Sequence, residues 1–180
     1  MNKIPATIVT GFLGAGKTSL LRHLVENSGR RLALIINEFG EIGMDRELLL
    51  GCADERCRAG DVIELANGCI CCTVADDFLP TMEALLARPD APDHIVIETS
   101  GLALPKPLLK AFALPQVRTR VSVDGVIAVI DAPAVAKGGY AADAESMAIA
   151  RAGDPNIEHL TPIEELFADQ VTTADLVLLN

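Results

Sequence analysis

The sequence has little positive charge and no long hydrophobic run. Its 15 Lys and Arg are outnumbered by 25 Asp and Glu, so the formal net charge of the 180-residue chain is −10. A surface of this charge repels nucleic acid and anionic membranes. No apolar stretch is long enough to cross a bilayer, and the apolar N-terminus is too short for a signal peptide. We therefore expect a cytoplasmic protein that binds neither nucleic acid nor membrane.

The chain also lacks internal repeats, low-complexity tracts and the two separate Cys-x-x-Cys pairs of structural zinc sites. It has five cysteines, three of which lie within four positions. Cysteines so close in sequence are poor disulfide partners, which indicates a reducing compartment and metal or redox chemistry. Half of the residues are hydrophobic, so we expect one domain with a substantial core over residues 1–180.

Short apolar runs alternate with helical patterns along the chain. The first unit is a predicted βαβ, with strands at 4–9 and 32–36 around a helix from Lys17 to about Asn27. Strands that are apolar on both faces belong in a parallel sheet covered by helices. The sequence thus predicts an α/β fold, a three-layer αβα sandwich with a mostly parallel sheet. Later strands are expected at 94–97, 126–130 and 176–179, and later helices at 73–88, 105–113 and 161–171.

Two regions near the C-terminus give weaker local patterns. Residues 132–154 are rich in Ala, Gly and Asp, which favours a peripheral loop or weak helix. Thr161-Pro162-Ile163-Glu164 matches a capping box with proline at the first helical position. The last predicted strand ends beside Asn180, where an open α/β sheet ordinarily continues into another helix. We therefore expect the domain to be incomplete at its C-terminus.

The segment Gly11-Phe12-Leu13-Gly14-Ala15-Gly16-Lys17-Thr18 matches the phosphate-binding pattern G-x-x-x-x-G-K-T, between a predicted strand and a predicted helix. Glycines let the backbone curl until several N–H groups point at one phosphate, and the helix start adds its positive end. Lys17 would reach the β- and γ-phosphates, and the Thr18 hydroxyl would bind Mg²⁺. A glycine-rich turn with a stray lysine is the alternative. The predicted nucleotide contacts in this segment are Gly11, Gly14, Ala15, Gly16, Lys17, Thr18 and Ser19.

Carboxylates follow two of the predicted strands. The segment Asn37-Glu38-Phe39-Gly40-Glu41-Ile42-Gly43-Met44-Asp45 suits either a mobile switch near the γ-phosphate and Mg²⁺ or a solvated acidic turn. In Glu98-Thr99-Ser100-Gly101, Glu98 would hold a water on Mg²⁺ and the Gly101 N–H would meet the γ-phosphate, with an ordinary turn as the alternative. Leu102 stands where many small GTPases carry a water-orienting glutamine, which predicts slow hydrolysis. The predicted catalytic residues are Lys17, Glu98 and Gly101.

Cys69, Cys71 and Cys72 form a second chemically distinctive cluster. In an extended chain Cys69 and Cys71 share a face, and a turn at Cys72 would add a third sulfur. Thiolates bind Zn²⁺, Cu(I) and tetrahedral Co²⁺, and three ligands leave one position open for metal release. Small cysteines packed in an apolar core are the alternative. Glu38 is the preferred fourth ligand, ahead of Cys52 or Cys57, because it would link the metal to the switch.

Together these motifs resemble the CobW family of P-loop GTPases over essentially the whole chain. The resemblance rests on the segments 11–18, 37–45, 64–72 and 98–101. It implies a metallochaperone that binds a divalent metal in the Mg²⁺- and GTP-bound state and releases it after hydrolysis to GDP. Residues 71–78 resemble the cobalamin-biosynthesis branch, which implies Co²⁺ as the cargo. Zinc delivery within the same family is the alternative.

The resemblance also implies roles for single residues and for partners. Asp45 joins Thr18 and Glu98 on the Mg²⁺ side, and Asn180 matches the first residue of a guanine-reading Asn-Lys-x-Asp motif. Only the asparagine of that motif is in the sequence, so the choice between GTP and ATP stays open. The receiving partner would be a metal-accepting protein such as a cobaltochelatase, and a nucleotide-dependent dimer is expected. Two other classes stay open: a structural zinc-binding module with incidental nucleotide binding, and a kinase, which would need an acceptor pocket and a base. The implied ligands of the transferred metal are Cys69, Cys71, Cys72 and Glu38.

Overall fold

The computed structural model describes residues 3–36, 62–64, 78–141 and 161–180. Within these ranges, six strands form one sheet of order β3-β2-β4-β1-β5-β6, and every neighbouring pair is parallel. The strands are β1 Ile4–Thr10, β2 Leu32–Ile36, β3 Val62–Glu64, β4 His94–Glu98, β5 Val121–Ile130 and β6 Leu176–Leu179. The helices are α1 Lys17–Asn27, α4 Leu79–Leu86, α5 Pro105–Phe112, α6 Pro115–Arg118, α7 Ala132–Ala136 and α9 Ile163–Thr173.

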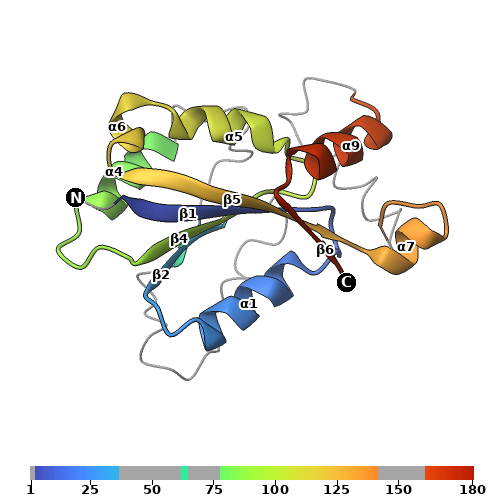
Figure 1. Cartoon of the computed structure of the whole chain (residues 1–180), viewed down its shortest axis with the longest axis horizontal. Helices are drawn as coiled ribbons and strands as arrows, with labels where there is room; N and C mark the ends of the chain where they lie inside the picture. Colours follow the sequence, from blue (N-terminus) through green and yellow to red (C-terminus); the bar gives the residue numbers. More distant parts are fainter. Residues whose placement is uncertain (1–2, 37–61, 65–77, 142–160) are drawn as a thin grey trace.

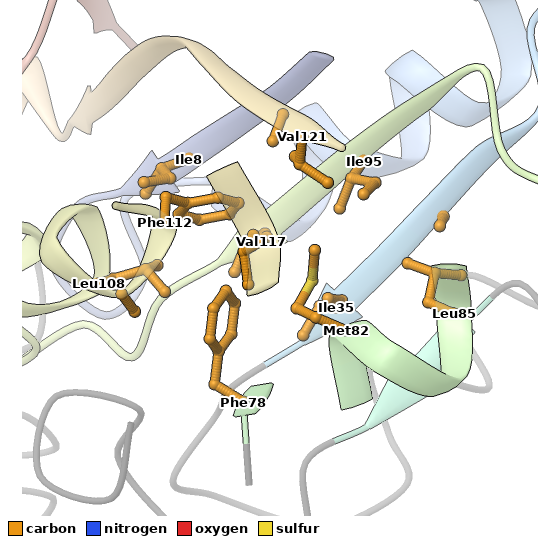
Figure 2. Packing of buried hydrophobic residues seen from close by; sticks show 14 of the residues in the cluster. Ile8, Ile35, Phe78, Met82, Leu85, Ile95, Leu108, Phe112, Val117 and Val121 are labelled. Carbon is orange, nitrogen blue, oxygen red and sulfur yellow. The ribbon is translucent and has the colours of Figure 1, made fainter. Parts of the chain in front are cut away.

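Helices cover both faces of the sheet, so the three-layer αβα prediction is confirmed (Figure 1). On the face of α4, α5 and α6, strand residues such as Ile8 and Ile95 pack against Phe78, Met82 and Phe112 (Figure 2). The Phe78 and Phe112 rings meet at a centroid distance of 5.2 Å. Met82, Leu85 and Leu86 form the buried side of α4, and Pro80 lies in its first turn. Burial of these side chains supplies most of the favourable folding free energy.

The opposite face is covered by α1, which buries Leu21 against Val9, Leu34 and Val96. The helix begins and ends at the residues that the sequence predicts, Lys17 and Asn27. Gly29, two residues beyond its end, has a φ of 65°, the left-handed conformation that terminates many helices. Apolar residues on both faces of the strands are thus explained by two covering layers.

Some local predictions were wrong. The strand predicted at 126–130 is longer, since β5 begins at Val121. It continues through an irregularity at Asp124 in the pairing with β1, where the Asp124 carboxylate accepts a hydrogen bond from the Thr7 hydroxyl at 2.9 Å. Polar residues and Gly125 there resemble a turn in sequence. The short elements β3 and α6 were not predicted. The capping box was also wrong, because Pro162 has an extended ψ of 146° and is itself the N-cap of α9, without a side-chain cap.

An ion pair joins the residues that immediately precede β2 and β4. The Arg31 guanidinium and backbone N–H both donate to the Asp93 carboxylate, at 3.3 and 3.1 Å. These hydrogen bonds hold the pKa of Asp93 below its ordinary value.

Among the described helices, none combines the length and the hydropathy that a membrane span requires.

Candidate functional site

The loop between β1 and α1 has the shape that the phosphate-binding pattern predicts. Gly11, Gly14 and Gly16 have φ values of 140°, 76° and 103°, which L side chains rarely adopt. The Ala15 N–H donates to the Phe12 carbonyl at 3.1 Å and closes a turn inside the loop. Because α1 starts at Lys17, its first N–H groups and positive dipole end lie at this loop. Thr18 is half-buried and Ser19 is exposed on the same first turn.

Lys17 and Glu98 form a buried charged pair at the mouth of this loop. The Lys17 side chain is 5% exposed and that of Glu98 is 1% exposed, and Nζ lies 4.0 Å from Oε1. Nζ also donates to the Phe12 carbonyl at 3.3 Å. The two residues meet because Val9 and Glu98 are register partners in parallel strands. Buried charges are costly unless partnered, so their presence here favours a site that binds charged ligands.

Gly101, the third predicted catalytic residue, packs directly on the phosphate-binding loop. A Cβ atom at this position would lie 2.7 Å from the Leu13 backbone nitrogen and 3.2 Å from the Phe12 carbonyl carbon. The segment that leads to Gly101 is anchored as well, since the Thr99 N–H donates to the Val9 carbonyl at 2.9 Å. Access to a phosphate is one reason for glycine at this position. The structure gives a further reason, which is close approach of two backbones.

Asn180 lies against the other side of the same loop. Its Nδ2 donates to the Ala15 carbonyl at 3.0 Å, and a Cβ on Gly16 would come within 2.5 Å of that nitrogen. The Asn180 backbone pairs with Ile130, which fixes it at the end of β6 beside β5. In the structure this side chain therefore supports the loop backbone, a contact that the base-reading prediction did not include.

Comparison with known proteins agrees with this geometry. The family model of the CobW/HypB/UreG nucleotide-binding domain matches residues 5–180. The chain belongs to this family. A zinc chaperone CobW from a Sinorhizobium species is 59% identical over 179 residues, which cover 99% of this chain and 51% of that protein. A zinc chaperone CobW from Pseudomonas aeruginosa is 56% identical over 183 residues, covering 99% of this chain and 48% of that protein.

A solved structure shares the fold of this chain. The crystal structure of zinc-bound YjiA GTPase from Escherichia coli has a TM-score of 0.57 and 29% sequence identity, over 99% of this chain and 49% of that one. The chain spans about half the length of the curated relatives that it matches first. The family and the P-loop NTPase fold predicted from the motifs are thus confirmed.

An apolar cluster that the motifs did not predict packs against the phosphate-binding loop from the side of α9. Phe12 is 2% exposed, and its ring meets those of Tyr140 and Phe167 at centroid distances of 6.2 and 5.8 Å. Leu102 and Leu166 pack in the same cluster. Phe12 occupies a variable position of the G-x-x-x-x-G-K-T pattern, so the motif gave no reason to select it. The only available signal was the apolar side of α9.

The predicted residues of the transferred-metal site lie outside the described residues. These are Glu38, Cys69, Cys71 and Cys72, together with the alternative ligands Cys52 and Cys57 and the predicted Mg²⁺ ligand Asp45. Within residues 3–36, 62–64, 78–141 and 161–180, no group of three or more His, Cys, Asp or Glu side chains is placed to hold a metal ion. The metal-binding predictions therefore stay predictions.

Proposed function

We propose that the protein is a GTP-hydrolysing metallochaperone, which converts GTP and water to GDP and phosphate and carries a divalent metal to an accepting protein. The observation that carries the proposal is the buried Lys17–Glu98 pair at a glycine loop opening onto the start of α1. Relatives named zinc chaperones and a neighbour named a GTPase support the same function. The described strands form one sheet that the described helices cover, which supports a single nucleotide-binding domain over residues 1–180.

The loop residues fit a nucleoside triphosphate bound with Mg²⁺. The positive-φ glycines expose backbone N–H groups, and Lys17 supplies the cation for the β- and γ-phosphates. Thr18 and Glu98 offer the oxygen ligands that Mg²⁺ prefers, with Asp45 as a further carboxylate. When bound, Mg²⁺ neutralises charge that develops on the phosphate oxygens. Gly101 would present its N–H to the γ-phosphate, and the absence of a glutamine at Leu102 keeps hydrolysis slow.

The cargo site would be formed by Cys69, Cys71 and Cys72, with Glu38 as the fourth ligand in the GTP-bound state. Thiolates bind Zn²⁺ and Co²⁺, and availability in the cell decides much of the selectivity. The names of the relatives favour Zn²⁺. Delivery of Co²⁺ to a cobaltochelatase for cobalamin biosynthesis is the narrower hypothesis. Three reduced thiols suit a cytoplasmic location, and a nucleotide-dependent dimer would allow release to be controlled by hydrolysis.

A metal titration tests the link between the two sites. The full-length protein is titrated with Zn²⁺ and, separately, with Co²⁺, in the presence of Mg²⁺ and a non-hydrolysable GTP analogue, in the presence of Mg²⁺ and GDP, and without nucleotide. If the segment that bears Glu38 is ordered by GTP, metal affinity should be about ten- to a hundredfold higher with the analogue. The metal with the larger ratio is the better candidate for the cargo. Equal affinities in all three states would contradict a nucleotide-controlled carrier.

Replacement of Gly101 by alanine tests the contact between the two loops. The added Cβ would press on the Leu13 nitrogen at 2.7 Å, so the loops must separate. We expect Gly101→Ala to lower the kcat for GTP hydrolysis by about a hundredfold, the effect of misplacing a catalytic group by roughly 1 Å. Steady-state kinetics at saturating GTP measures the change.

Gly125→Ala is the matched control. A Cβ at residue 125 would have its nearest neighbour, Asp175 Oδ2, at 3.8 Å, an ordinary van der Waals contact. This variant should keep kcat within about twofold of the wild type, as substitutions without steric conflict do. An equal loss in both variants would mean that the Gly101 contact has no special role in the reaction.

A further inference from the structure

Gln170 is a buried polar residue that no motif explains. It lies on α9, and its side chain is 2% exposed. Its Nε2 donates to the backbone carbonyls of Gly101 and Ala103, at 3.1 and 3.2 Å. Both neighbours are acceptors, so only the amide nitrogen, with its two hydrogens, can face them. Gln170 and Gly101 are 69 positions apart in the sequence.

Gly101 is therefore held from two directions. On one side its Cα faces the backbone of Leu13 in the phosphate-binding loop, where there is no room for a Cβ atom. On the other side its carbonyl accepts the hydrogen bond from Gln170. Gly101, whose N–H would meet a γ-phosphate, thus lies between the loop and α9, and the carbonyl that accepts from Gln170 belongs to the next peptide group, between Gly101 and Leu102.

Other contacts fix the position of α9 relative to Gly101 and the phosphate-binding loop. Phe167, one turn before Gln170, packs its ring on Phe12 of the phosphate-binding loop at a centroid distance of 5.8 Å. Asp169 pairs with Lys106 on α5, the helix that follows the Gly101 segment. The two helices lie side by side on one face of the sheet (Figure 1). A shift of α9 would consequently move Gln170 relative to Gly101.

We propose that Gln170 is a positioning residue for hydrolysis, which fixes the backbone at Gly101 through its hydrogen bonds to the carbonyls of Gly101 and Ala103. This inference rests on the proposed GTPase function. GDP lacks the γ-phosphate and has no group for the Gly101 N–H to meet, so the hydrogen bonds of Gln170 matter for the triphosphate and for the chemical step. They are not needed to bind GDP.

The test uses the full-length protein with Gln170→Met and Gln170→Glu. Methionine keeps the length and helix preference of glutamine but donates no hydrogen bond. A glutamate carboxylate would face two carbonyl oxygens and repel them. For both variants we expect kcat for GTP to fall about tenfold or more, as for a displaced catalytic group, with GDP affinity unchanged. Steady-state kinetics, GDP titration and thermal unfolding are measured on each.

Gln116→Met is the matched control, because Gln116 is exposed on α6 and the same substitution there should change neither kcat nor GDP affinity. If Gln170→Met does not fold, Gln170→Glu decides the question. An unchanged kcat in a folded Gln170 variant would overturn the inference, as would a parallel loss of kcat and GDP affinity. Absence of GTP hydrolysis by the wild-type protein would instead refute the proposed function, so the two failures are distinguishable.

Discussion

Lys17→Met is expected to lower kcat/KM for GTP by about a thousandfold, because it removes a preorganised cation from a phosphate site. The ammonium is the only one of the predicted catalytic groups that carries positive charge. It is held inside the loop by the Phe12 carbonyl, close to where the β- and γ-phosphates would lie. Methionine keeps the length of the side chain and removes the charge. Steady-state kinetics and titration with a fluorescent GTP analogue measure the loss.

The same substitution removes the cation 4.0 Å from the Glu98 carboxylate, which is 1% exposed. Thermal unfolding must therefore accompany the kinetics, so that a loss of stability is not taken for a loss of catalysis. Lys110→Met is the control, since Lys110 is exposed in the last turn of α5. It should leave kcat/KM unchanged. Full activity of a folded Lys17→Met protein would mean that the glycine loop does not bind the triphosphate.

The phosphate-binding loop and most strands of the sheet could be predicted because their signals are local. Parallel strands that are buried on both faces are apolar throughout, and the glycine pattern fixes the strand before it and the helix after it. The ends of α1 followed from the same logic. In these parts of the fold, the residue types of a short segment are enough to specify its local structure.

The residues that brace the loop could not be predicted in the same way, because their roles depend on contacts between distant segments. Gln170 lies on the buried side of α9, three positions after Phe167 and four after Leu166. A polar residue at such a position is a signal, yet sequence alone does not identify its partners, Gly101 and Ala103. The first half of β5 was missed because Asp124 and Gly125 resemble a turn.

The structure also shows how the phosphate-binding loop is supported from elements far along the chain. Asn180 at the end of β6 binds the Ala15 carbonyl, while Phe167 of α9 packs on Phe12. Gly101, just after the end of β4, packs on Leu13. Three parts of the loop thus contact three different elements, so a change in any of these elements would alter the geometry of the phosphate site.

The cysteine cluster gives the second large expected effect. Replacing Cys69, Cys71 and Cys72 together by serine should lower the affinity for Zn²⁺ by about a thousandfold or more, because sites built from such thiolates bind with roughly 10 kcal/mol or more. Serine has nearly the same size, but its hydroxyl keeps its proton at neutral pH and is a poor zinc ligand. Glu38 alone would remain. Competition with a zinc-binding dye, in the presence of Mg²⁺ and a GTP analogue, measures the affinity.

Nucleotide binding separates this prediction from general damage to the protein. In the absence of metal, the triple variant should bind the GTP analogue as the wild type does, because the phosphate-binding loop is intact. In the presence of Zn²⁺, the wild type should bind the analogue more tightly and the variant should not, since coupling between two ligands is reciprocal. Cys52→Ser combined with Cys57→Ser is the control and should keep wild-type zinc affinity. If the triple variant holds zinc as tightly as the wild type, the metal-carrier proposal is wrong and only a nucleotide hydrolase is left.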